Sequence, residues 1–163
     1  MNRTAKNTAL SADVVLQVPF YDVDTMRMAW HGNYLKYCEQ ARCALLDKIQ
    51  YNYIDMEASG FMWPIVDLRL KFVRPAHFNQ WIRARATITE YENRLRMEYL
   101  ISDEQSGARL TRGYSLQVAV AIGSGEMQYV SPPVLLEKIQ EFLGAPQAGK
   151  FQENSGREPA THR

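Results

Sequence analysis

The sequence lacks several features that would have assigned a function at once. It has no long apolar run, only two cysteines among its 163 residues, and a formal net charge of only +1. A nucleic-acid partner normally requires a concentrated basic surface, so we expect none here. The first eleven residues carry Arg3 and Lys6 but no apolar run, so we expect neither a signal peptide nor a membrane span, and no membrane partner.

The cysteines also exclude some chemistry. Cys38 and Cys43 lie five residues apart in one predicted helix, on different sides of it, so they cannot readily form a disulfide or share a metal ion. The two carboxylates of Asp22 and Asp24 have no evident third ligand beside them, which makes them a poor metal site. We therefore expect a protein of the reducing cytoplasm that uses no metal or other cofactor.

What the sequence does contain is clear periodicity. We predict a strand over residues 14–20, followed by a helix from about residue 33 to residue 49 that buries one apolar stripe and has Asn33 as its N-cap. A short helix at 54–59 ends at Gly60. Four strand-like runs follow without another long helix; they cover residues 65–73, 81–89, 95–101 and 110–122.

The order of these elements predicts the fold class. The turns at 90–93, 103–107 and 123–125 suit antiparallel hairpins, and a last helix, capped by Ser131 with Pro132 at its first position, reaches residue 143. One strand, one long helix and then consecutive antiparallel strands form an α+β pattern. We predict a curved antiparallel sheet wrapped around the helix, in one domain over residues 12–143, with flexible tails at 1–11 and 144–163.

The most informative segment runs from Tyr21 to Tyr34 and reads Tyr-Asp-Val-Asp-Thr-Met-Arg-Met-Ala-Trp-His-Gly-Asn-Tyr. It leads from the first strand into the long helix and places the carboxylate of Asp24 a few residues ahead of the first helical turn. The start of a helix has unpaired N–H groups and a partial positive charge. Those groups can bind a developing oxyanion while the carboxylate attacks a carbonyl or activates water. This pattern suits thioester hydrolysis without a metal.

Three short motifs carry a family resemblance. Tyr21-Asp-Val-Asp24, Trp30-His-Gly-Asn-Tyr34 and Glu39-Gln-Ala-Arg42 resemble the 4-hydroxybenzoyl-CoA thioesterase family of hotdog-fold proteins. Tyr34 follows Asp24 by ten residues and Arg42 follows Tyr34 by eight, as in the family pattern. The stretch Phe72-Val-Arg74-Pro75-Ala76 is similar to the segment after the family's second strand. The resemblance covers roughly residues 13–143.

This resemblance implies a fold, an activity and an assembly. The fold is the hotdog fold, in homodimers that often form tetramers, and the activity is hydrolysis of acyl-CoA or acyl-carrier-protein thioesters at the dimer interface. Asp24 would be the catalytic carboxylate, and the backbone N–H of His31 would hold the thioester oxygen. The acid can attack directly or deprotonate water, and the sequence leaves both mechanisms open. Coenzyme A would enter only as part of the substrate.

Several side chains are candidates for contact with the substrate. Flexible sulfur atoms and flat rings near Asp24 suit an apolar acyl chain or an aryl group. Asn33 and Tyr34 are packing and capping groups that can also touch the substrate, and Arg74 can meet the phosphates of CoA, as can Lys71 or His77. The other candidates are Tyr21, Met26, Met28, Trp30 and Trp63, with Phe61 and Met62 beside the last.

Alternatives remain open at the level of sequence. Some other hotdog thioesterases carry their acid on the central helix, which makes Glu39 a rival to Asp24. Many family members have glycine two or three residues after the aspartate, whereas this chain has Met26 and Arg27, whose side chains we expect to narrow or reshape the site. A non-hydrolytic hotdog protein that binds acyl thioesters, or a hotdog dehydratase, would fit the same fold.

Overall fold

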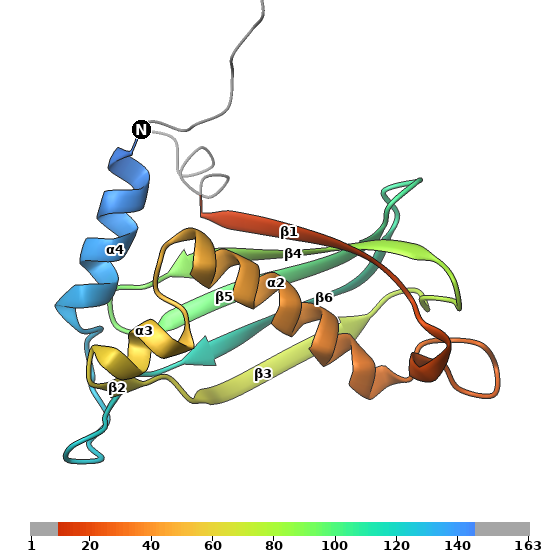
Figure 1. The fold of residues 1–163 in the computed structure, drawn as a ribbon. Coiled ribbons are helices and arrows are strands. Elements are labelled where there is room, and N and C mark those ends of the chain that lie inside the picture. The colour runs from red at the N-terminus through yellow and green to blue at the C-terminus, as the bar shows by residue number, and fades with distance from the viewer. Residues whose placement is uncertain (1–9, 146–163) are drawn as a thin grey trace, which may run out of the picture.

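The computed structural model describes residues 10–145 and confirms the α+β class. A five-stranded antiparallel sheet of order β1-β4-β5-β6-β3 curves along the long helix α2 (Figure 1). A two-stranded sheet pairs β2 with β7. The strands are β1 (Ser11–Gln17), β2 (Phe61–Met62), β3 (Ile65–Phe72), β4 (Trp81–Glu90), β5 (Leu95–Asp103), β6 (Arg109–Gln117) and β7 (Val120–Ala121). The helices are α2 (Tyr34–Lys48), α3 (Tyr53–Ala58) and α4 (Pro133–Gly144), with single 3-10 turns η1 (Phe20–Asp22) and η2 (His31–Asn33).

The predicted element boundaries differ from the observed ones by a few residues. Strand β1 begins at Ser11, the last residue of the predicted N-terminal tail, and it ends at Gln17 because η1 follows directly after Pro19. Helix α4 ends at Gly144, one residue beyond the predicted domain. Leu10, also assigned to the N-terminal tail, is buried, and its carbonyl accepts the N–H of Ile88 at 2.9 Å. Residues 1–9 and 146–163 of the two predicted tails lie outside the described residues. Within residues 10–145, no helix has both the length and the apolar character that crossing a membrane requires.

The single strand predicted over residues 110–122 is wrong. Strand β6 ends at Gln117, and β7 belongs to the two-stranded sheet with β2. Polar Thr111 and Ser115 of β6 are buried, and the Ser115 hydroxyl bonds to the Tyr99 hydroxyl at 2.7 Å. The inner face of β6 is therefore polar. A prediction that follows only the apolar residues does not detect that β6 ends at Gln117 and that the chain then leaves the five-stranded sheet.

The two predicted helix caps also differ from the structure. Pro132 is the N-cap of α4, and it makes no side-chain cap, so the prediction that Ser131 caps this helix is wrong. The backbone N–H of Ser131 instead donates to the carbonyl of Glu92 at 2.9 Å, which holds Ser131 outside the helix. Asn33 is the N-cap of α2, but its side-chain amide donates to the backbone carbonyl of Asp22 at 2.8 Å rather than capping the helix.

The core lies between α2 and the inner face of the sheet. The stripe of α2 that faces the sheet is buried, and it meets the small side chains Ala84 and Ala86 of β4. Small residues at these positions let the helix approach the sheet closely, and Ile82 and Ile88 fill the space on either side. The buried stripe consists of Tyr34, Tyr37, Cys38, Ala41 and Leu45, with Leu46 beside it.

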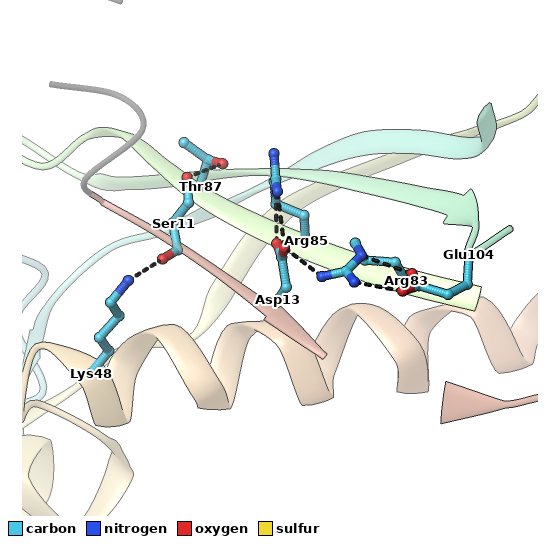
Figure 2. Close-up of polar contacts among 7 residues, drawn as sticks. All are labelled: Ser11, Asp13, Lys48, Arg83, Arg85, Thr87 and Glu104. Atoms are coloured by element: carbon cyan, nitrogen blue, oxygen red, sulfur yellow. Dashed lines mark hydrogen bonds and ion pairs between the residues drawn. The ribbon is translucent and has the colours of Figure 1, made fainter. Parts of the chain in front are cut away.

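The outer face of the sheet near β1 and β4 is covered by paired charges (Figure 2). Asp13 accepts hydrogen bonds from Arg85 at 2.6 Å and from Arg83 at 3.0 Å, and Arg83 also reaches Glu104 at 2.6 Å. The hydrogen bond from Arg85 lowers the pKa of the Asp13 carboxyl below its ordinary value. Each arginine of β4 on this face therefore has a carboxylate partner.

Gly113 of β6 marks the closest approach of β3 to its neighbour. A Cβ atom at this position would lie 2.0 Å from the backbone carbonyl oxygen of Arg69 in β3. Backbone cannot move aside as a flexible side chain can, so only glycine fits here without shifting β3.

We predict that Gly113→Ala lowers the free energy of unfolding by roughly 1–3 kcal/mol, the usual cost of overpacking. Urea denaturation followed by circular dichroism measures this change. Gly123→Ala is the matched control, because a Cβ atom there meets no atom within 4 Å. Equal stability of the two variants would contradict the close packing of β3 on β6.

Candidate active site

The loop between β1 and α2 is folded back on itself. Val23 pairs with Ala29 in a short antiparallel bridge, and the N–H of Asp24 donates to the carbonyl of Met28 at 2.8 Å. The N–H of Arg27 donates to the carbonyl of Asp24 at 2.9 Å, and Arg27 has a φ of 62°, in the left-handed region that favours glycine. The backbone at Arg27 therefore has the left-handed conformation that favours glycine, at a position where many members of the resembled family have glycine.

One oxygen of Asp24 is fixed by this loop. Oδ1 accepts hydrogen bonds from the backbone N–H of Met26 at 2.8 Å and of Met28 at 3.3 Å. Oδ2 has no hydrogen-bond partner within residues 10–145, and the side chain is half-buried. A carboxylate oriented through one oxygen, with the other oxygen free, has the form that a nucleophile or a general base requires.

The first turn of the long helical segment lies beside this carboxylate. His31 begins η2, which continues into α2, and no side chain caps this start. Within residues 10–145, the backbone N–H of His31 has no acceptor. It is therefore free to donate to a ligand oxygen, and the partial positive charge at the start of the helix favours an oxygen that carries developing negative charge.

Asp24 and His31 line one hollow with a volume of about 390 Å³, here called the Asp24 hollow. Its walls come from three segments, namely the loop with Asp24, the helix start, and the segment that follows β3. Of the predicted site residues, the hollow brings together Asp24, Met28, Trp30, His31, Tyr34 and Arg74. It also includes Ala29, Phe72, Val73 and Pro75. The last three belong to the family-like segment 72–76, which begins at the final residue of β3, and they were not predicted to meet the substrate.

Tyr34 joins the helix to the segment after β3. Its hydroxyl accepts a hydrogen bond from the backbone N–H of Ala76 at 2.9 Å, and its ring meets Phe72 edge-on with centroids 5.1 Å apart. Burial raises the pKa of the Tyr34 hydroxyl, and the negative charge of Asp24 adds to that effect. Tyr34 therefore stays protonated at neutral pH and keeps a proton to donate.

Trp30 covers the helix start from outside. Its ring lies 4.7 Å from the ring of His31, centroid to centroid, and it rests on Gly32. A Cβ atom on Gly32 would lie 2.0 Å from Cζ3 of Trp30, so any larger residue would displace the indole. The glycine thus lets a large apolar surface lie directly beside the free N–H of His31.

Four predicted site residues lie outside this hollow. Tyr21 is 84% exposed and Met26 is 67% exposed, and neither lines it. Asn33 is buried, and its side-chain amide donates a hydrogen bond to the backbone carbonyl of Asp22. Trp63 is buried at the other end of the molecule, where its indole N–H donates to the Tyr51 hydroxyl and where Phe61 and Met62 line a second hollow of about 380 Å³.

The expectation that Met26 and Arg27 narrow or reshape the site stays a prediction. Neither residue lines the hollow of about 390 Å³. The backbone carbonyl of Arg27 accepts the N–H of Phe78, and its guanidinium lies 5.4 Å from the centre of the Phe78 ring, so the side chain points into a neighbouring hollow. Asp24 also lines that neighbouring hollow, so the Arg27 side chain remains beside the candidate site.

Glu39, the alternative acid, has a different environment. Its carboxylate pairs with Arg42, accepts a hydrogen bond from the Tyr53 hydroxyl at 3.0 Å, and is near the Cys43 thiol. It does not line the Asp24 hollow. Both of its oxygens are engaged by neighbouring side chains, whereas Oδ2 of Asp24 is free.

The two cysteines are free thiols, in agreement with their spacing. Burial raises the pKa of the Cys38 thiol to about 12, and burial also raises the pKa of the Cys43 thiol. Thiols in this state are protonated at neutral pH and are poor nucleophiles. Neither lines the Asp24 hollow, so neither thiol is placed to attack a carbonyl there.

A family model described as the thioesterase-like superfamily matches residues 18–143. The chain belongs to this superfamily. The narrower resemblance to 4-hydroxybenzoyl-CoA thioesterases remains a prediction from the motifs.

Two curated relatives and one solved structure are similar to this chain. A putative acyl-CoA thioesterase of Bacillus subtilis is 30% identical over 76 residues, which are 47% of this chain and 55% of that protein. A putative esterase of Synechocystis is 26% identical over 128 residues, 78% of this chain and 77% of that protein. The crystal structure of a 1,4-dihydroxy-2-naphthoyl-CoA thioesterase from Synechocystis superimposes with a TM-score of 0.73 at 23% identity, covering 83% of this chain and 99% of that one. That likeness supports the hotdog fold, with the sheet wrapped along α2.

Asp22 connects the loop to the helix. It is 4% exposed, and its backbone carbonyl accepts both the N–H of Trp30 at 2.9 Å and the amide of Asn33 at 2.8 Å. Its carboxylate accepts a hydrogen bond from the Tyr37 hydroxyl at 2.8 Å, and Lys36 lies 3.8 Å away. Asp22 therefore positions the loop and does not pair with the carboxylate of Asp24.

We predict that Tyr37→Phe destabilises the protein by roughly 1.5–3 kcal/mol, the usual worth of a hydrogen bond to a charged group. The substitution leaves the buried carboxylate of Asp22 without its hydroxyl donor. Urea unfolding of the variant measures the cost. Tyr91→Phe is the control, because the Tyr91 hydroxyl has no partner in residues 10–145, and it should change stability by less than about 0.5 kcal/mol. A Tyr37→Phe protein as stable as the parent would refute this role.

Proposed function

We propose that this protein is a thioesterase that hydrolyses an acyl-CoA or acyl-carrier-protein thioester to a free acid and a thiol. The observation that carries this proposal is the presence, on one hollow, of a carboxylate with a free oxygen and an unpaired N–H at a helix start. The superfamily supports it, as does the Bacillus relative named a putative acyl-CoA thioesterase. A cytoplasmic location and the lack of a metal or other cofactor are parts of the same proposal.

In the proposed reaction, the thioester carbonyl oxygen accepts the N–H of His31. That N–H stabilises the negative charge that builds on the oxygen when the carbonyl carbon is attacked. In one route Oδ2 of Asp24 attacks, the C–S bond breaks, and water then hydrolyses the acyl-aspartyl anhydride. In the other route Asp24 accepts a proton from water while the water oxygen attacks, and the thiolate leaves and takes up that proton. Both routes give the same products.

The lining of the hollow supports an apolar acyl or aryl group. Met28, Trp30 and Phe72 supply a sulfur atom and two flat rings next to Asp24. Arg74 is exposed at the rim and can meet an anionic group of CoA. The solved structures with this fold include thioesterases of 1,4-dihydroxy-2-naphthoyl-CoA and of gentisyl-CoA, so aryl thioesters belong in the first substrate panel.

We further propose that the protein is a homodimer joined along β3. This strand is an edge of the five-stranded sheet, and apolar Val66, Leu68 and Phe72 are exposed on it. A long edge with exposed apolar side chains is a template for pairing with another chain. Such a dimer is also the natural unit of the tetramers that the family resemblance implies.

A two-fold axis through β3 would bring two different hollows together. In an antiparallel pair of β3 strands, the Ile65 end of one strand lies beside the Phe72 end of the other. Phe72 lines the Asp24 hollow, while Met62 and Trp63 line the hollow just before Ile65. The partner's Trp63 region would then extend the site, which reconciles its predicted role in substrate binding with its distance from Asp24 in one chain.

The first test is Asp24→Asn. We predict that turnover of acyl-CoA substrates falls by about 10²–10⁴-fold, the typical contribution of an acid or base group, while fold and oligomeric state persist. Thiol release from short, long and aryl thioesters, on CoA and on carrier protein, measures it. Glu137→Gln removes an exposed carboxylate of α4, outside both the hollow and β3, and should leave turnover unchanged.

The same assay distinguishes the alternatives. Normal hydrolysis by Asp24→Asn together with its loss in Glu39→Gln would move the active site to α2. A parent protein that binds the thioesters but releases no thiol would support the non-hydrolytic binding protein, and conversion of a 3-hydroxyacyl thioester to an enoyl thioester would support the dehydratase.

The proposed dimer is tested by Val66→Glu. Val66 is 57% exposed in one chain, so the charge should leave the fold intact but should separate subunits paired along β3. Light scattering coupled to size exclusion should give twice the chain mass for the parent protein and the single mass for this variant. Val130→Glu is the control, since Val130 is 62% exposed and lies outside β3. A monomeric parent, or an unchanged mass in Val66→Glu, rejects this interface.

A further inference from the structure

The outer face of the sheet carries two kinds of cation. On β4, Arg83 and Arg85 are bound to carboxylates (Figure 2). At the β3 and β6 side of the same face, Arg69, Lys71 and Arg112 have no carboxylate partner within residues 10–145. The charge on this part of the sheet is therefore not neutralised by the protein.

These unpaired cations surround a hollow of about 410 Å³, here called the basic hollow. Its side chains come from β3, β5 and β6, and those that matter are Arg69, Lys71, Arg96, Glu98, Arg112 and Tyr114. In the strand register Lys71 lies directly opposite Arg112. Like charges in directly opposed positions destabilise a sheet, so a bound anion would relieve a repulsion that is built into the fold.

The floor of the basic hollow is flat and aromatic. The guanidinium of Arg96 lies 4.0 Å from the centre of the Tyr114 ring, and its Nη2 is 3.6 Å from a Glu98 oxygen. The Tyr114 hydroxyl donates to Asp67 at 3.4 Å, which holds the ring along the strands. Glu98 balances Arg96, so the three cations on β3 and β6 remain for a ligand.

The basic hollow is separate from the Asp24 hollow. Successive residues of a strand point to opposite faces of a sheet. Phe72 meets Tyr34 on the helix side, so Lys71, its neighbour in β3, points to the outer face. No residue lines both hollows.

We propose that the basic hollow binds a phosphate-bearing small molecule of the nucleotide type. Arginine guanidinium groups match the geometry of phosphate oxygens and can bind them through two parallel hydrogen bonds, and lysine adds a point charge. The stacked Arg96 and Tyr114 side chains offer a planar surface for a base. The volume lies within the usual range for small-ligand sites, and the site is concave, which favours a small molecule over an acidic protein surface.

Two sources could supply this ligand. One is the nucleotide end of CoA, which carries a diphosphate and a 3′-phosphate, and the other is a free nucleotide that acts as an effector. Both present the same chemistry to Arg69, Lys71 and Arg112. The inference does not depend on thioester hydrolysis, because binding is measured without turnover.

The test is isothermal titration calorimetry of the full chain at low salt with CoA, ADP and inorganic pyrophosphate. We expect at least one probe to bind, and we expect Arg69→Gln and Arg112→Gln each to lower the affinity for that probe by roughly tenfold or more. Each variant removes a charge-assisted hydrogen bond to the phosphate. Arg109→Gln is the matched control, because it removes one exposed arginine from β6 outside the basic hollow and should not change affinity.

The kinetic arm identifies the source. If Arg69→Gln and Arg112→Gln raise KM for an acyl-CoA but not for the corresponding acyl-pantetheine thioester, the occupant is the nucleotide end of CoA. If KM is unchanged while ADP binding is lost, the occupant is a free nucleotide. Either result supports the site. The proposal is overturned if no probe binds, if Arg109→Gln weakens binding as much as the two variants do, or if the two variants alter the oligomeric state without altering anion binding.

Discussion

The buried backbone carbonyl of Asp22 is the interaction on which the site depends. It accepts hydrogen bonds from Trp30 and Asn33 while the Asp22 carboxylate holds Tyr37, so one residue binds the loop, the helix start and the body of α2 together. The loop that carries Asp24 closes through its own backbone hydrogen bonds. Among residues 10–145, Oδ2 of Asp24 and the N–H of His31 are left without a partner on one hollow, and these hydrogen bonds hold the loop and the helix start that carry them.

The two sides of the sheet also differ in how many of their groups have partners. On the β1 and β4 side its outer arginines are paired with carboxylates, and its inner face packs against α2. On the β3 side, the sheet ends in an edge strand with exposed apolar residues, and the outer cations Arg69, Lys71 and Arg112 have no carboxylate partner among residues 10–145. The proposed dimer would cover the edge and its apolar side chains, and the proposed ligand of the basic hollow would bind the cations.

The sequence predicted the elements that depend on local pattern. The apolar stripe of α2, the strands with alternating residues and the α+β order needed only periodicity, and Asp24, Met28, Trp30, His31, Tyr34 and Arg74 do line one hollow. The failures came where tertiary contacts decide. Ser131 does not cap α4 because its backbone N–H is held by the carbonyl of Glu92, and buried Ser115 on the inner face of β6 bonds to the hydroxyl of Tyr99. Trp63, predicted to contact the substrate, lies outside the Asp24 hollow of one chain, and only the proposed dimer would bring it there.

The central claim is that the thioester carbonyl lies between the Asp24 carboxylate and the N–H of His31. The most direct measurement is a crystal structure of the Asp24→Asn protein with an intact acyl-CoA. The account predicts the carbonyl oxygen within hydrogen-bond distance of the His31 nitrogen, at about 2.7–3.1 Å, with the carbonyl carbon facing the side chain of residue 24. A thioester bound beside Glu39, or one whose carbonyl oxygen points away from the helix start, would contradict it.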